Sequence, residues 1–323
     1  MGRRELAAVV DELPTLRDRD EGIAARATQA FTHPPTTAAS PPPAVPQEGE
    51  PSPGVGTTGV GVAAIRAAET NRPDRLFADP LAAAFVAASG WTPAAPPGDR
   101  RVASLRAWIV ARTVFLDELL ASACQDGGRQ VVLLGAGFDA RAYRLPWPVG
   151  VRCFELDTAD VLDHKARVLA SQAAQPACER IPVACDLRED WPGVLLAAGF
   201  TPGQPTAWIA EGLLVYLEPD DVDGVVADLT SLSAPGSRLG LTLSGRPPAA
   251  PGGGPVRWDV ALRRSVAPDD PAGWLSGHGW RTGQMTGAAE VLGAHGRTTA
   301  ASPPRPRGGR PGGLLIDATR AQP

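Results

Sequence analysis

The sequence predicts an α/β fold, with a doubly wound, mostly parallel sheet and helices on both faces. Three observations support this prediction. Short apolar runs of strand length alternate with longer amphipathic runs from residue 131 to residue 318, as in repeated β-α-β units. The first run, 131–135, is apolar up to its glycine, which is typical of a strand covered on both faces. It leads directly into Gly135 and Gly137, where a tight turn from strand to helix is expected.

Each apolar run predicts one strand, and the predicted strands cover residues 131–135, 151–156, 181–185, 207–210, 238–243 and 314–318. The amphipathic runs predict helices over residues 159–174, 191–198, 219–232, 270–278 and 288–295. Parallel strands place their carboxyl ends at one edge of the sheet. Motifs that follow different strands are therefore expected to meet at that edge.

The chain before residue 125 divides into a tail and a helical region. Prolines crowd residues 34–53, and proline resists both helix and sheet because it lacks a backbone donor. We therefore predict a disordered tail over residues 1–56, with at most a short helix at residues 5–13. A folded domain is expected over residues 57–323, made of a helical cover, 57–124, and an α/β core, 125–323. The cover's helices are expected at residues 60–70, 81–88 and 102–124.

Composition narrows the classes of function. A formal net charge of -4 argues against the basic footprint of a nucleic-acid-binding protein. No run approaches the roughly 18 apolar residues of a membrane span, and residues 1–10 lead into no signal-peptide core, so a cytoplasmic location is expected. The four cysteines and four histidines lack metal-binding spacing. We predict reduced thiols, no metal site, and no nucleic-acid or membrane partner.

Motifs at the ends of the first two strands indicate a bound nucleotide. Gly135, Ala136 and Gly137 follow the first strand, and glycines let a backbone approach a ligand closely. Asp157 ends the second strand about 20 residues later, where a carboxylate can bind the two hydroxyls of a ribose. A tight turn without a ligand is the alternative for the glycines. Together the motifs predict an adenosine-containing cofactor, and they do not distinguish a dinucleotide from S-adenosylmethionine.

Later strand ends carry further polar groups. Asp186, followed by Leu187, ends the third strand and could accept a hydrogen bond from an adenine amino group. Capping of the next helix is the alternative for this aspartate. Glu211 and Tyr216 follow the fourth strand, where a substrate would meet the cofactor. For these two residues the alternatives are a helix cap and a packed side chain.

With these motifs in this order, the chain resembles the leucine carboxyl methyltransferase-like family. Within that family it is similar to a bacterial branch of S-adenosylmethionine-dependent O-methyltransferases, often associated with polyketides and other secondary metabolites. The resemblance extends from about residue 58 to residue 320. It rests on segments at residues 61–67, 76–80, 111–113, 115–117, 134–145, 154–157, 186–187, 211–217, 233–238 and 277–280. Each segment is a weak signal alone, and the ordered set is specific.

The resemblance implies a class I methyltransferase fold, with seven strands and an extra N-terminal helical layer over the active site. It implies S-adenosyl-L-methionine as the cofactor. Gly135, Ala136 and Gly137 would then lie at its methionine part, Asp157 on the ribose, Asp186 and Leu187 beside the adenine, and Arg112 at its carboxylate. Glu211 and Tyr216 are implied as catalytic residues near the transferred methyl group, and Glu211 also as a cofactor ligand.

Two departures from the family pattern affect these expectations. Ala140 stands where the family usually has threonine or serine, which is a mild change. Residues 245–255 are unusually rich in proline and glycine, in a region where family members build part of the substrate pocket. The identity of the methyl acceptor is therefore left open.

A small-molecule O-methyltransferase is the predicted function. No histidine lies in the motifs at the sheet rim, and His278 is the nearest candidate base. A carboxylate acceptor, which is already ionised at neutral pH, is therefore favoured over a phenol. The alternatives are a methyltransferase for a protein's C-terminal carboxylate, a nucleotide-dependent oxidoreductase, and a homologue that binds the cofactor without turnover. The oligomeric state is left open.

Overall fold

The computed structural model describes residues 55–90, 100–244, 267–297 and 313–322. The predicted tail therefore lies outside the described residues up to residue 54. The helix expected at residues 5–13 and the segment 245–255 lie outside them as well.

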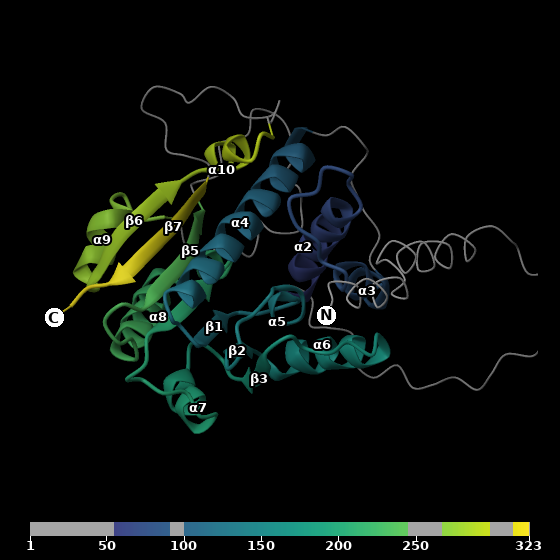
Figure 1. Ribbon diagram of the computed structural model, residues 1–323. Coiled ribbons are helices and arrows are strands. Elements are labelled where there is room, and N and C mark those ends of the chain that lie inside the picture. The colour runs from purple at the N-terminus through teal and green to yellow at the C-terminus, as the bar shows by residue number, and fades with distance from the viewer. Residues whose placement is uncertain (1–54, 91–99, 245–266, 298–312, 323) are drawn as a thin grey trace, which may run out of the picture. The chain divides into compact units, whose positions relative to one another are not determined.

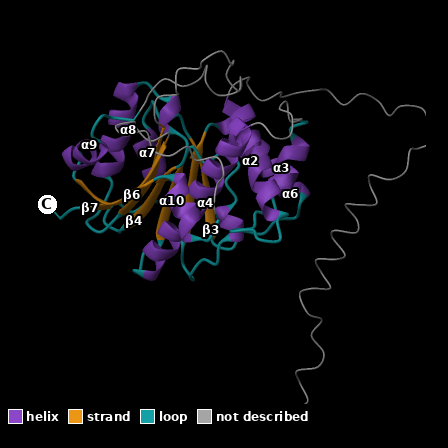
Figure 2. Ribbon diagram, turned by 90° about the horizontal axis from the view of Figure 1, so that it is seen from above, coloured by secondary structure: helices purple, strands orange, loops and turns teal. Residues whose placement is uncertain are grey.

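Strands β1 to β7 form one sheet (Figure 1, Figure 2), and they cover Gln130–Leu134, Arg152–Asp157, Glu179–Ala184, Thr206–Ala210, Arg238–Ser244, Trp280–Thr286 and Gly313–Arg320. Their order across the sheet is β3-β2-β1-β4-β5-β7-β6. Neighbours from β3 to β5 pair in parallel, whereas β7 runs antiparallel to both β5 and β6. The chain order reverses between β1 and β4, and a crevice for a ligand is expected at such a switch point.

The predicted fold class is confirmed, and every predicted strand lies within two residues of its expected bounds. Strands β1 and β4 are buried at each position, as their continuous apolar runs indicated. The pattern did not predict β6, because only Trp280 of this edge strand is buried and a mostly exposed strand has no apolar run.

The helices cover Val55–Thr70 (α2), Ala82–Ala88 (α3), Arg100–Gln125 (α4), Arg141–Arg144 (α5), Ala159–Ser171 (α6), Trp191–Ala197 (α7), Pro219–Ser231 (α8), Pro271–Gly277 (α9) and Ala288–Ala294 (α10), with a short 3-10 turn, η1, at Leu214–Tyr216. Proline stands in the first turn of α7, α8 and α9, where its missing N–H costs nothing. Asp190 and Asp270 cap α7 and α9 by accepting from a backbone N–H at 3.0 Å.

Two layers of helices enclose the sheet. Alternate side chains of β1 show this division: Val132 and Leu134 pack towards α7, α8 and α9, and Val131 and Leu133 pack towards α4 and α10. Successive side chains of a strand point to opposite faces, so both halves of β1 are buried. The long helix α4, which the sequence grouped with the cover, thus forms part of the layer on one face of the sheet (Figure 1).

Helices α2 and α3 form the additional N-terminal layer that the sequence predicted. They pack with α6 around Phe138, which follows the Gly135-Ala136-Gly137 turn. Phe85 of α3 stacks on the Phe138 ring with centroids 5.1 Å apart, and such pairs add to the free energy gained by burial alone. The apolar contact of this layer is therefore made directly against the loop that carries the glycine motif.

Three features of the described ranges bear on the classes of function that the composition argues against. No helix in residues 55–90, 100–244, 267–297 or 313–322 is long and apolar enough to cross a membrane. Within the same ranges, no group of His, Cys, Asp and Glu could hold a metal ion. The thiols of Cys124, Cys153, Cys178 and Cys185 are free.

Candidate active site

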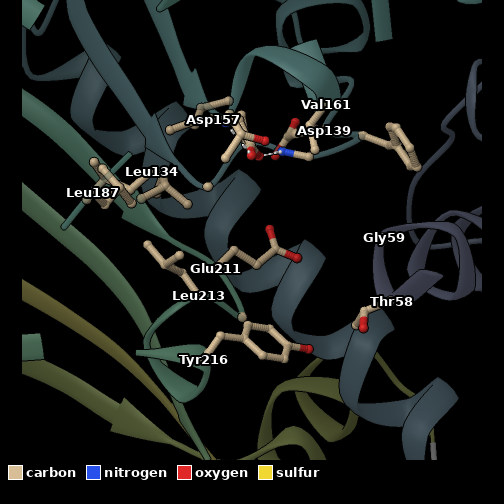
Figure 3. A pocket seen from close by; sticks show the side chains of 18 of the residues that line it. Thr58, Gly59, Leu134, Asp139, Asp157, Val161, Leu187, Glu211, Leu213 and Tyr216 are labelled. Atoms are coloured by element: carbon tan, nitrogen blue, oxygen red, sulfur yellow. Dashed lines mark hydrogen bonds between the residues drawn. The ribbon is translucent and has the colours of Figure 1, made fainter. Parts of the chain in front are cut away.

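A cavity of about 400 Å³ lies at the carboxyl ends of β1, β2 and β4, and Thr58 and Gly59 of helix α2 line one side of it (Figure 3). This volume is in the usual range for a small-molecule site. The structure brings every predicted site residue to its wall: Arg112, Gly135, Ala136, Gly137, Asp157, Asp186, Leu187, Glu211 and Tyr216. Their individual roles remain predictions, and their contacts are described in turn below.

The turn after β1 depends on its glycines. Gly135 has φ +61° and Gly137 has φ +47°, a region that favours glycine over residues with a side chain. A Cβ on Gly135 would lie 2.9 Å from Leu213 Cδ1, so the site also lacks space for one. The Ala136 N–H donates to the Leu156 carbonyl at 2.9 Å. This bond holds the turn against the end of β2, next to Asp157.

Asp157 is held in place by backbone donors. Its Oδ2 accepts from the Gly137 N–H at 2.7 Å and its Oδ1 from the Thr158 N–H at 2.8 Å. Burial raises the pKa of this carboxyl above its usual 3.8, and the two backbone hydrogen bonds act in the opposite direction. Each carboxylate oxygen has a second lone-pair direction. The side chain can therefore accept ribose hydroxyls while it keeps the glycine turn in place.

Asp186 forms a fork-shaped ion pair with Arg188 at the end of β3. Arg188 Nε lies 2.9 Å from Asp186 Oδ1, and its Nη2 lies 2.5 Å from Oδ2. The Arg188 guanidinium lowers the pKa of this carboxyl. Both residues line the cavity, so the carboxylate lies within reach of a ligand there and keeps its remaining acceptor sites.

Glu211 lies between Asp157 and Tyr216 on the cavity wall (Figure 3), and each of its two oxygens contacts an arginine. Its Oε1 is 2.8 Å from Arg112 Nε, and its Oε2 is 2.6 Å from Arg141 Nη1. Burial acts to raise the pKa of Glu211, but the two guanidinium groups outweigh it and lower the pKa from 4.5 to about 2. The Glu211 carboxyl is therefore ionised at neutral pH.

Arg141 and Arg66 were not predicted from the sequence as site residues. Arg141 is fully buried and contacts Asp139 and, at 2.7 Å, Asp117 as well as Glu211. Arg66 of α2 pairs with Asp79 at 3.3 Å and donates to the Phe138 carbonyl at 2.7 Å. Both arginines lie in segments that carried the family resemblance. The signal in the sequence that could have identified them is an arginine within an otherwise apolar motif.

Tyr216 and Thr58 line the end of the cavity away from Asp157 (Figure 3). In this view the Tyr216 hydroxyl points to the side where Thr58 lies. Thr58 Oγ1 is buried and has no hydrogen-bond partner among the residues that the structure describes. A buried hydroxyl without a partner costs free energy, so a ligand that supplies one would bind here favourably. His278, in contrast, lies at the end of α9, where its Nδ1 is 3.0 Å from the Trp274 carbonyl, and it is not part of this wall.

The lining residues fit the cofactor predicted from the sequence. Asp157 and Asp186 supply acceptors for ribose hydroxyls and an adenine amino group, and the apolar Val161 and Leu187 lie near them for the base. Arg112 pairs with Glu211 through its Nε and lines the cavity, where a guanidinium can bind the carboxylate of a ligand. Gly135 and Gly137 carry no side chain, so the turn does not fill the space between the acceptors for the adenosine and the Arg112 guanidinium.

Comparison with known proteins identifies the family. The family model described as leucine carboxyl methyltransferase matches residues 59–230, which is more than half of the chain. A relative from Streptomyces avermitilis is 50% identical over 280 residues, which cover 83% of this chain and 96% of the relative. Relatives from Streptomyces coelicolor and Frankia alni are 48% and 47% identical, with 83% and 84% of this chain covered and 96% of each relative. All three are provisionally named S-adenosyl-L-methionine-dependent methyltransferases.

A solved structure with a similar course of the chain is that of a DUF574 family protein, also from S. avermitilis. It has a TM-score of 0.48 and 16% sequence identity, and the match covers 80% of this chain and 96% of that one. The family predicted from the ordered motifs is confirmed by the family model and by these relatives. The chain belongs to the leucine carboxyl methyltransferase family, and it is a methyltransferase.

Proposed function

We propose that this methyltransferase moves the methyl group of S-adenosylmethionine to a carboxylate oxygen of a small molecule. The cofactor is the one that the relatives' names give and that the lining residues fit. A secondary metabolite is the class of acceptor that the resemblance implies, and the cytoplasm is the compartment expected from the sequence. The choice of a carboxylate over a phenol or an alcohol is supported by one feature of the cavity wall.

That feature is the lack, among the described lining residues, of a side chain suited to remove a proton near pH 7. The lining carboxyls Glu211, Asp139 and Asp186 have lowered pKa values because arginines lie beside them. The fourth, Asp157, has a pKa raised by burial, but it already accepts from the backbone N–H groups of Gly137 and Thr158 and is assigned to the ribose. Burial raises the pKa of the lining thiol, Cys185, to about 11. Neither histidine nor lysine occurs among the lining residues. A general base works best with a pKa near the working pH, so an acceptor that is already ionised is favoured.

Different residues of the wall bind different parts of the cofactor and the acceptor. The bound cofactor supplies an activated methyl group, so the protein has to provide binding and orientation. Asp157 holds the ribose on the adenosine side, the backbone of the glycine turn lies at the methionine part, and the Arg112 guanidinium holds the carboxylate. We assign the acceptor to the hydroxyls of Thr58 and Tyr216, which can donate to a carboxylate oxygen. Helix α2 borders this end of the cavity, and orientation of the reactants can supply much of the rate acceleration.

Glu211 is assigned in this proposal as a positioning group and not as a base. Both of its oxygens contact arginines, and its pKa of about 2 leaves it a very weak proton acceptor at neutral pH. Its predicted catalytic role would then be indirect. It keeps the Arg112 guanidinium turned towards the cavity, where the cofactor carboxylate would lie.

A matched panel of acceptors tests the proposal. Purified protein and S-adenosylmethionine are incubated with pairs of aromatic compounds that differ only in carrying a carboxylate or a phenol, and methyl esters and ethers are quantified. We expect methyl esters, with kcat/KM nearly constant from about pH 6 to 9 because no group on the wall must lose a proton. Methylation of phenols only, or a rate that rises steeply with pH, would show that the acceptor assignment is wrong. The Tyr216→Phe variant should raise KM more than it lowers kcat.

A further inference from the structure

Four charged side chains form a closed ring, with two members in the cavity wall and two behind it. Arg112 Nε lies 2.8 Å from Glu211 Oε1, Glu211 Oε2 lies 2.6 Å from Arg141 Nη1, and Arg141 Nε lies 2.7 Å from Asp117 Oδ1. Arg112 and Asp117 both belong to α4, so the backbone of that helix closes the ring. Arg112 and Glu211 line the cavity, whereas Arg141 and Asp117 lie outside its lining.

Arg141 is the most deeply buried member of the ring. It is fully buried and is surrounded by the carboxylates of Asp117, Asp139 and Glu211. A guanidinium presents its donors in a rigid plane, so three carboxylates around it have their positions set relative to one another. The opposite end of Asp117 is fixed as well, because Arg144 Nη1 lies 2.6 Å from its Oδ2. Arg141 therefore has little freedom to turn.

Because Arg141 holds Glu211 in place, Glu211 in turn restricts the orientation of Arg112. With Oε2 fixed by Arg141, the Glu211 carboxylate presents Oε1 to Arg112 Nε in a single orientation. Gly212 provides the space for this arrangement, since a Cβ there would lie 2.8 Å from Arg112 Nη1. The Nε edge of the Arg112 guanidinium is thus turned to the ring, and its Nη1 lies beside Gly212, which is itself part of the cavity wall.

We propose that Arg141 is a positioning residue for the carboxylate of the cofactor, which it orients through Glu211 and Arg112 without touching the ligand itself. This inference rests on the proposed cofactor. It predicts that the loss of Arg141 weakens binding of the amino-acid part of the cofactor and leaves binding of the adenosine part unchanged. A side chain needed only for folding would affect both parts equally.

Two ligands separate these possibilities. S-adenosylhomocysteine carries the amino-acid carboxylate, whereas 5′-methylthioadenosine keeps the adenosine and the thioether but lacks that group. Dissociation constants for both are measured by isothermal titration with the full chain. For Arg112→Gln and Arg141→Gln we expect S-adenosylhomocysteine to bind about 10- to 100-fold more weakly, as for the loss of a charge-assisted hydrogen bond. Binding of 5′-methylthioadenosine should change by less than about twofold.

Arg180→Gln is the matched control. Arg180 lies 2.7 Å from Glu155 in a second buried ion pair, which does not line the cavity, so this variant should bind both ligands as the wild type does. If Arg141→Gln does not fold, Asp117→Asn weakens the ring from its other side and should lower the affinity for S-adenosylhomocysteine selectively. An equal loss for both ligands, or no loss for either, would overturn the role of Arg141. Failure of the wild type to bind S-adenosylhomocysteine would instead overturn the proposed function.

Discussion

Glu211 shows how far the chemistry of one side chain depends on its partners. Its position after the fourth strand could be read from the sequence, and so could the expectation that it faces the ligand. Its partner Arg141 lies 70 positions earlier in the chain, and no spacing rule connects residues so far apart. The sequence therefore predicted the residue, while the two guanidinium groups that keep it ionised follow only from the fold.

The two arginines should make stability depend on the ionisation of Glu211. Its pKa is about 2 in the folded protein against 4.5 without these partners. A carboxyl with a lowered folded pKa stabilises the fold above its unfolded pKa, and that contribution is lost as the pH falls through the folded pKa. On the order of 3 kcal/mol should therefore be lost between pH 4.5 and pH 2. Urea unfolding at a series of pH values should show a flatter dependence for Glu211→Gln than for the wild type.

Asp157→Asn is the control for this pH experiment, because its effect on the unfolding free energy should change with pH in the opposite direction. Burial raises the folded pKa of Asp157, so its contribution to stability increases as the pH falls and the carboxyl becomes protonated. The difference in unfolding free energy between the wild type and Asp157→Asn should therefore grow on acidification, whereas the difference for Glu211→Gln should shrink. Parallel curves for the wild type and Glu211→Gln would contradict the ion pairs described for Glu211.

At the scale of the elements, the contact between α4 and β5 depends on a glycine in the middle of a strand. A Cβ on Gly240 would lie 2.7 Å from Leu116 Cδ2 and 3.0 Å from Leu119 Cδ1, and both of these side chains belong to α4. A glycine inside a strand often marks such a close approach. The sequence predicted both elements, but not that the long helix lies across this strand.

We expect Gly240→Val to destabilise the protein by about 1–3 kcal/mol, because the core around it has no room for added methyl groups. Gly283→Val in the edge strand β6 is the matched control. There the nearest atom to an added Cβ is 3.5 Å away, an ordinary contact, and the change should stay within about 0.5 kcal/mol. The free energy of unfolding in urea measures both. Equal losses for the two variants would show that helix α4 does not approach β5 as closely as described.

At the scale of the whole molecule, the site gathers residues from Thr58 to Leu217 into one cavity. A ligand that binds only the folded state stabilises it by mass action, by about 2.7 kcal/mol at a concentration 100 times its dissociation constant. S-adenosylmethionine at that concentration should therefore raise the melting temperature by several degrees. NAD at the same concentration should leave it unchanged.

Two glycine variants give this melting experiment its control. Gly135 and Gly150 both have positive φ, at +61° and +84°, so alanine costs backbone strain at either position. Only at Gly135 would the new Cβ meet another side chain at the cavity, whereas nothing lies within 4 Å at Gly150. Both variants should melt lower than the wild type, but only Gly135→Ala should lose the shift with S-adenosylmethionine. A full shift in Gly135→Ala would contradict the placement of the cofactor beside this turn.

The sequence by itself determined the order of strands and helices, the family, and the residues at the ends of β1 to β4, because local periodicity and short motifs specify these features. Strand β6 could not be predicted, since it is mostly exposed at the edge of the sheet and carries no apolar run. The tertiary structure alone decided which charges meet. Arg112, Arg141 and Glu211 come from separate elements and come together only because the parallel strands bring their carboxyl ends, with α4 packed against them, to one place.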